Sequence, residues 1–313
     1  MQSTKQSIFF HERPITDLKF HRDGDIFFTA SKDCSASMIN LEGKILGSFD
    51  KHSGAISTID SFQNTFLTAG TDLLLVKWDI LTGSIESTIY CDAVVRGIDF
   101  GEQIYFCTDN SMSKEAFVGM VDPKTNALHR IISLFEPSSK IFKIDNSIIF
   151  STTNGKVCKL DLRNQRIIQE TKVHQSKITD MKPSACRSFF VTSSMDSSAK
   201  IIDTETFIVK KRFDSEEPIN SVAVFNTNDI IVCVGGINAR DVTATRGKSS
   251  FDTNFFDIVT QQKIGYFTTH FGTINAIDVH PQSTHYISGG EDSSVCLVKL
   301  GMDFKEAPFT KLN

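Results

Sequence analysis

A spaced pattern of polar residues recurs four times along the chain and constrains its fold more than any other feature. In each copy, a histidine precedes an aspartate by 20 or 22 residues, and a serine or threonine stands four residues before that aspartate. The four sets are His11, Thr29 and Asp33; His52, Thr68 and Asp72; His174, Thr192 and Asp196; and His270, Ser288 and Asp292. Four coincidences at one spacing indicate a chain built from repeated structural units.

The residue composition favours β-strands within these units. The 313 residues are 40% hydrophobic, include 26 Phe, and are rich in Ile, Val, Ser and Thr. Branched and aromatic side chains fit the pleated surface of a sheet, and no long stretch has helical periodicity. Each repeat histidine also leads into a strand-like segment, at 15–18, 56–59, 178–181 and 274–277. The chain is therefore predicted to be all-β.

The repeat resembles the WD repeat, which has about 40–45 residues and forms one four-stranded blade of a β-propeller. In that family the histidine bonds the aspartate and the Ser or Thr, and a tryptophan on the third strand closes the set. The resemblance implies that Trp78 has this role in the second repeat. In the other three repeats the same position carries Ile39, Ile202 or Val298.

Three more repeats are placed by spacing alone, and they begin near Val94, Ile141 and Pro218. Seven units in 313 residues give about 45 residues each, which is the period expected of a propeller blade. A closed ring leaves no exposed sheet edge between blades, so residues 6–10 are expected to pair with the last strands. The prediction is a single seven-bladed WD-repeat β-propeller spanning residues 1–313.

An enzymatic reading of the repeat is possible, because His, Asp and Ser also form hydrolase triads. The same trio recurs four times in one position of the repeat, however, and this recurrence indicates a structural role. The acidic pairs 216–217 and 291–292 have no matching His or Cys set for a metal, and residues 235–240 do not fit the dinucleotide-binding spacing. We expect no enzyme activity, no metal and no cofactor.

Charge and cysteine content restrict the partners and the compartment. The net charge of −4 argues against nucleic-acid binding through bulk charge, and no stretch approaches the roughly 18 apolar residues of a membrane span. The seven cysteines form no CxxC pair, and free thiols in a reducing compartment explain them best. A cytoplasmic protein without direct sequence-specific nucleic-acid binding or membrane attachment is expected.

The repeat is stretched between Gly236 and Phe255, where a polar, basic segment replaces a tight turn. A long loop on a rigid scaffold often carries function, although a tolerated surface insertion would have the same appearance. The segments 239–245, 247–248 and 255–256, together with 11–16, 270–275 and 288–292, resemble one WD-repeat family, that of subunit I of eukaryotic translation initiation factor 3. The resemblance covers nearly the whole chain.

This resemblance implies a scaffold that binds the B and G subunits of the factor, the first of them along blades five and six. It also implies a role in assembling the factor on the small (40S) ribosomal subunit and in supporting scanning. The partner-binding candidates are Glu216, Arg240 and Asp241. An alternative is another WD-repeat adaptor, such as the kinase-receptor-associated protein that serves RNA–protein assembly, but the loop sequence at 241–243 favours the initiation factor.

Overall fold

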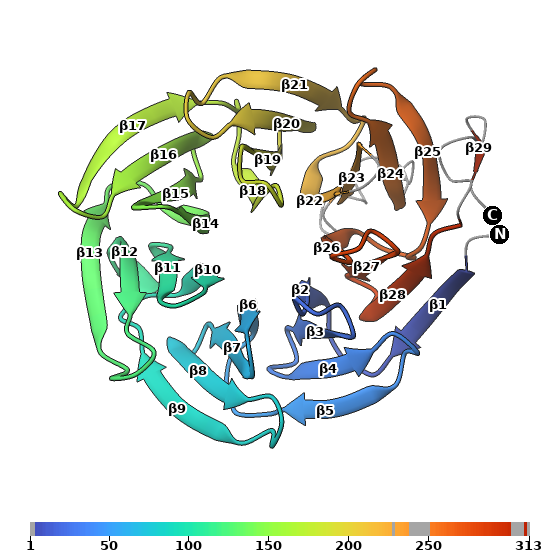
Figure 1. The fold of residues 1–313 in the computed structure, drawn as a ribbon. Helices are drawn as coiled ribbons and strands as arrows, with labels where there is room; N and C mark the ends of the chain where they lie inside the picture. The colour runs from blue at the N-terminus through green and yellow to red at the C-terminus, as the bar shows by residue number, and fades with distance from the viewer. Residues whose placement is uncertain (1–3, 227–228, 238–250, 302–309, 312–313) are drawn as a thin grey trace.

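The chain forms a ring of seven small antiparallel sheets, as predicted (Figure 1). The computed structural model describes residues 4–226, 229–237, 251–301 and 310–311. Strands alternate between neighbouring positions within each sheet, so that the first strand of every blade lies at the centre of the ring and the last lies at its rim. The only described helix is a short 3-10 turn, η1 (Ser111–Ser113).

The first four blades follow the chain in order. They consist of β2 (Ile15–Phe20), β3 (Ile26–Ser31), β4 (Ala36–Asn40) and β5 (Ile45–Phe49); β6 (Ile56–Phe62), β7 (Thr65–Gly70), β8 (Leu74–Asp79) and β9 (Ile85–Tyr90); β10 (Val95–Phe100), β11 (Ile104–Thr108), β12 (Ala116–Val121) and β13 (Leu128–Leu134); and β14 (Ser138–Ile144), β15 (Ser147–Thr152), β16 (Lys156–Asp161) and β17 (Arg166–Lys172).

The last three blades complete the ring. They consist of β18 (Ile178–Pro183), β19 (Phe189–Ser194), β20 (Ser198–Asp203) and β21 (Val209–Asp214); β22 (Ile219–Phe225), β23 (Ile230–Gly235), β24 (Asp252–Asp257) and β25 (Lys263–Thr268); and β26 (Ile274–Val279), β27 (His285–Gly290), β28 (Ser294–Lys299) and β1 (Thr4–Phe9). A short strand β29 (Thr310–Lys311) pairs in parallel with β25.

The ring closes by pairing the two ends of the chain within blade seven. Strand β1 is antiparallel to β28 over six residue pairs, from Thr4 opposite Lys299 to Phe9 opposite Ser294. This confirms the closure expected for residues 6–10. Because β1 supplies the outer strand, blade seven needs both ends of the chain to be complete.

Apolar residues fill the seams between neighbouring blades. One cluster joins Ile15 and Leu18 of blade one to Ile287 of blade seven. Another joins blades one and two, where Phe28 stacks on Phe66 with ring centroids 4.2 Å apart. Burying one such side chain contributes about 1.5–3 kcal/mol, so the seams hold the ring together.

The inner strand of every blade has a β-bulge near its second residue. A bulge re-aims the side chain that it carries. In six blades this side chain donates a hydrogen bond to the backbone carbonyl at the start of the next blade's inner strand. The donors are Thr16, Ser57, Ser139, Thr179, Asn220 and Asn275, and the distances run from 2.6 to 3.0 Å. We call this set the bulge belt.

A second set of bonds crosses the seams deeper in the channel, and we call it the channel belt. Here a polar side chain of one inner strand accepts a backbone N–H from the next. The acceptors are Asp17, Asp60, Asp99, Asp180, Ser221 and Asp278. These two belts link the apolar seams to a polar central channel.

Candidate functional site

The structure brings the members of each repeated polar set together. In blade two, His52 Nδ1 lies 2.9 Å from Asp72, its Nε2 lies 2.8 Å from Thr68 Oγ1, and Trp78 Nε1 donates to the same hydroxyl at 3.0 Å. A carboxylate can only accept, so Nδ1–H is the donor to Asp72. The bond to Asp72 and the contact with Thr68 together occupy both ring nitrogens of His52.

The other three sets have the same geometry without the tryptophan. The histidine–aspartate distances are 2.8 Å for His11 and Asp33, 3.0 Å for His174 and Asp196, and 3.0 Å for His270 and Asp292. Opposite nitrogens lie 2.8 to 3.0 Å from the hydroxyls of Thr29, Thr192 and Ser288. The residues at the tryptophan position, Ile39, Ile202 and Val298, are buried.

Sequence reasoning missed a serine that joins these three sets. Ser35, Ser198 and Ser294 stand two residues after the aspartate; each donates to it at 2.6 to 2.8 Å and lies 3.0 to 3.3 Å from the histidine Nδ1. In blade two, which keeps the tryptophan, the same position carries Leu74. The Asp-x-Ser spacing was visible in the sequence, and it marks the blades that have lost the indole N–H.

The electrostatics of the sets fit buried structural groups. Burial lowers the pKa of His174 to about 4, although the Asp196 charge opposes this shift. Burial alone would raise the pKa of Asp196, but hydrogen bonds from Ser198, the Gln175 N–H and His174 lower it to about 2. His270 differs, because its burial is outweighed by bonds to Asp292 and Cys296, which raise its pKa to about 9.

The predicted partner-binding residues divide into two groups. Glu216 is exposed in the turn between β21 and β22, on the rim of a cavity of about 170 Å³ that blades five and six line. Asp214 beside it is exposed and pairs with Arg212 at 2.7 Å. Arg240 and Asp241 lie outside the described residues, as does most of the long loop. The described part of this surface is therefore acidic at its rim.

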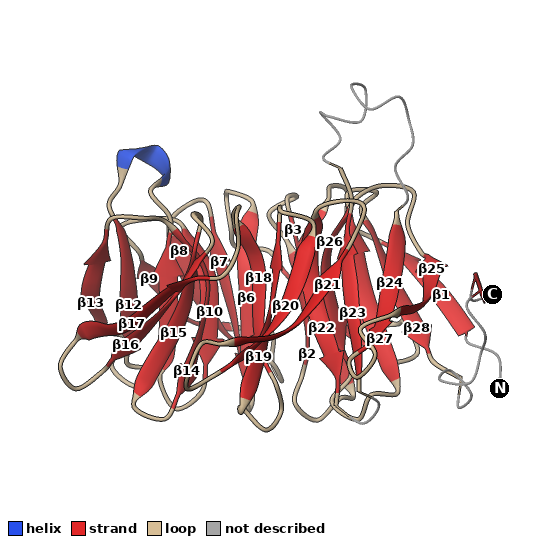
Figure 2. Cartoon of the chain, turned by 90° about the horizontal axis from the view of Figure 1, so that it is seen from above, coloured by secondary structure: helices blue, strands red, loops and turns tan. Residues whose placement is uncertain are grey.

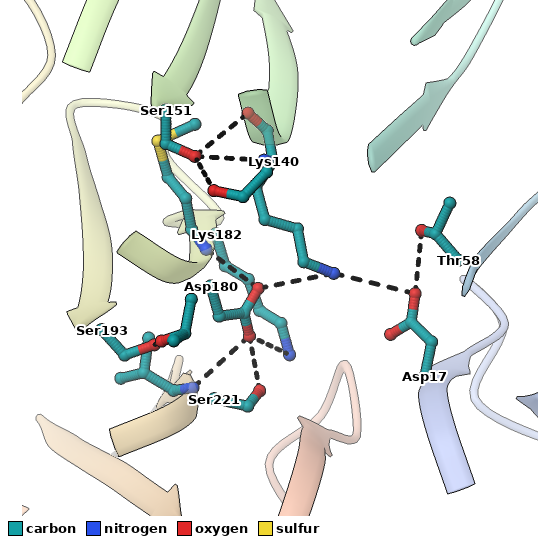
Figure 3. A network of polar contacts seen from close by, with 12 residues as sticks. Asp17, Thr58, Lys140, Ser151, Asp180, Lys182, Ser193 and Ser221 are labelled. Carbon is teal, nitrogen blue, oxygen red and sulfur yellow. Dashed lines mark hydrogen bonds and ion pairs between the residues drawn. The ribbon is translucent and has the colours of Figure 1, made fainter. Parts of the chain in front are cut away.

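The central channel holds a charged network that the sequence analysis did not identify (Figure 3). Lys140 of blade four reaches to Asp17 of blade one and Asp180 of blade five, with its Nζ 3.8 Å from a carboxylate oxygen of each. Lys182 bonds to Asp278 at 3.4 Å and to the Ile277 carbonyl. These contacts include ion pairs between blades that are not neighbours in the ring.

Burial and charge in this network oppose one another. Burial raises the pKa of Asp180, but Lys182, Lys140 and the Ser221 hydroxyl outweigh it and hold that pKa below its usual value. Burial lowers the pKa of Lys140, but Asp17 and Asp180 outweigh it, so the ammonium stays charged. Separately, no group of three or more His, Cys, Asp or Glu side chains suited to a metal occurs among the described residues. No helix in the described part of the chain could cross a membrane.

Comparison with known proteins places these features in one family. A family model described as EIF3I matches residues 7–310. A protein named eukaryotic translation initiation factor 3 subunit I from Candida glabrata is 33% identical, with 94% of this chain and 93% of the relative covered. The proteins of the same name from Nematostella vectensis and Drosophila willistoni are 31% and 32% identical, covering 96% and 91% of this chain and 97% and 94% of their own length.

Proposed function

Because the chain belongs to the family of eukaryotic translation initiation factor 3 subunit I, we propose that it is a non-enzymatic scaffold subunit of that factor in the cytoplasm. The observation that carries this proposal is the extent of the family match, since residues 7–310 take in all seven blades. The proposal gives the chain a role in assembling the factor on the 40S ribosomal subunit and in supporting scanning.

The histidine sets support a scaffold over an enzyme. A catalytic histidine needs a ring nitrogen within reach of substrate. In all four sets the two nitrogens are within hydrogen-bond distance of the chain's own aspartate and hydroxyl, and each histidine is buried. Their chemistry is therefore directed at holding each blade together.

We propose that the contact with the B and G subunits of the factor lies on blades five and six. The exposed carboxylates of Glu216 and Asp214 line one cavity there, and Glu216 has no ion pair among the described residues. A basic side chain on a partner helix would complement this rim and gain a charge-assisted hydrogen bond. Arg240 and Asp241 belong to the same proposed surface by their place in the loop that follows β23.

Affinity purification of the tagged chain from cell extract tests the proposal. We expect recovery of the large subunits of the factor and of 40S particles. Glu216→Arg should reduce recovery of the partner subunits, whereas the matched variant Glu102→Arg, an exposed residue of blade three, should not. Failure of the wild-type chain to recover either the factor subunits or 40S particles would contradict the proposed function.

A further inference from the structure

A large cavity opens at one mouth of the central channel, on the face of the ring that carries η1 (Figure 2). It measures about 640 Å³, and all seven blades contribute to its lining. The network around Asp17, Lys140 and Asp180 forms its floor, because these residues also line the cavity at the opposite mouth. The mouth is thus a closed-ended recess above a charged floor.

Three cations from consecutive blades meet on one side of this recess: Arg96, Lys140 and Lys177. Arg96 pairs with Asp109 at 2.6 Å, and Lys140 pairs with the floor carboxylates. In the described part of the chain, Lys177 has no carboxylate within 4.0 Å. Partial burial lowers its pKa, and the neighbouring charges of Arg96 and Lys140 lower it further. This side of the recess therefore has an uncompensated positive charge.

The position of Arg96 reflects a departure from the bulge belt. Every other bulge residue spans a seam, whereas Arg96 occupies the bulge of β10 and forms its ion pair with Asp109 on the recess lining. The seam between blades three and four consequently has no bulge-belt bond among the described residues. A stabilising contact is given up at the point where a cation is presented to the recess, which is a pattern typical of functional sites.

We propose that this recess binds an acidic peptide segment of a partner protein, with Lys177 and Arg96 receiving its carboxylates. The recess is much larger than a free anion requires. Phe135 is fully exposed on the loop that supplies Pro137 to the lining, and an exposed aromatic ring offers an apolar anchor to a peptide. Since the whole chain carries a net charge of −4, an acidic peptide is repelled elsewhere, and the local cations select this position.

Fluorescence anisotropy with the purified full chain tests the inference, and it does not depend on recovery of the initiation factor. The probe is a labelled peptide of six glutamates and one leucine, and its counterpart with glutamines serves as the neutral control. Lys177→Glu should weaken binding of the acidic peptide by about tenfold or more, while Lys177→Arg should preserve it. Phe135→Ala should weaken it by about threefold.

The matched control is Lys44→Glu, which makes the same charge change at an exposed turn between β4 and β5. It should leave the affinity unchanged. Equal affinity of the wild-type chain and Lys177→Glu would overturn the inference, and so would an equal loss in Lys44→Glu. Equal binding of the glutamate and glutamine peptides would also overturn it, because the carboxylates would then have no role.

Discussion

Blades one, two, five and seven differ from blades three, four and six in how they fill the same internal position. The first group places a histidine against a Ser or Thr. In the second group the histidine position carries Cys91, Leu134 or Ser215, and the Ser/Thr position carries Phe106, Phe150 or Cys233. In none of the three does a lone His or Thr remain. A buried polar group is costly without its partner, whereas replacing both partners with apolar groups can be nearly neutral, so the pair is exchanged as a unit.

The seams show a related contrast. Seams between the first group of blades and their neighbours generally have bonds of both belts, as between blades one and two. Among the described residues, the seam between blades three and four has only the channel-belt bond from Asp99, and the seam between blades four and five has only the bulge-belt bond from Ser139. Blade four is thus the least cross-linked blade at its inner edge.

The largest expected effect comes from removing a histidine at the centre of a complete set. His52→Ala leaves Asp72, Thr68 and the Trp78 N–H without their shared partner and should lower the free energy of unfolding by about 3–5 kcal/mol. Cys91→Ala, at the same position of blade three, should cost only about 1–2 kcal/mol, since it removes apolar volume alone. Urea unfolding measures both, and equal losses would contradict the distinction between the blades.

Acid should destabilise blade five but not blade three. The pKa of His174 is about 4 in the folded chain and 6.5 unfolded, so the unfolded state binds more protons between these values and stability falls as the pH drops through this window. Between pH 7 and pH 5 the loss should be about 2 kcal/mol. Faster amide hydrogen exchange in β18–β21 than in β10–β13, relative to pH 7, measures it. Equal acceleration in both blades would exclude this cause.

The weakly linked seams offer a smaller effect. Ser139→Ala removes the bulge-belt bond between blades four and five, where no channel-belt bond among the described residues compensates, and should cost about 1–2 kcal/mol. Thr179→Ala is a matched variant, because Thr179 also bonds a serine hydroxyl of its own blade, but its seam keeps the bond from Asp180. It should open its seam less. Hydrogen exchange in the inner strands compares the two, and greater opening in Thr179→Ala would contradict the seam account.

The smallest effect concerns the serine that accompanies loss of the tryptophan. Ser198→Ala removes one donor to Asp196 and should lower the free energy of unfolding by about 1 kcal/mol. Thermal unfolding measures the change. A stability equal to that of the wild type would show that the serine does not substitute for the indole N–H.

The propeller and its closure could be predicted from the sequence because the repeat fixes both spacing and partners. His174, Thr192 and Asp196 are widely separated in the chain, yet the strand register brings them together as the repeat implies. The blades without histidine could be placed from their apolar runs and from the expected period, which β14 and β22 bear out.

The channel could not be predicted in the same way. Thr16, Ser57 and Asn220 look like ordinary polar residues of alternating strands, and only the bulge turns their side chains across a seam. The contact of Lys140 with Asp17 depends on the diameter of the closed ring, which no local pattern contains. The proposed partner surface is also only partly described, since Arg240 and Asp241 fall outside the described residues.

A double-mutant cycle tests most directly whether the polar pair and its apolar replacement fill the same structural role. His174→Cys and Thr192→Phe together give blade five the pair that blade three has in Cys91 and Phe106. Each single change should be strongly destabilising, and the double variant should be no less stable than His174→Cys alone, with a coupling energy of at least about 1 kcal/mol. Losses that simply add, measured by urea unfolding, would contradict the account.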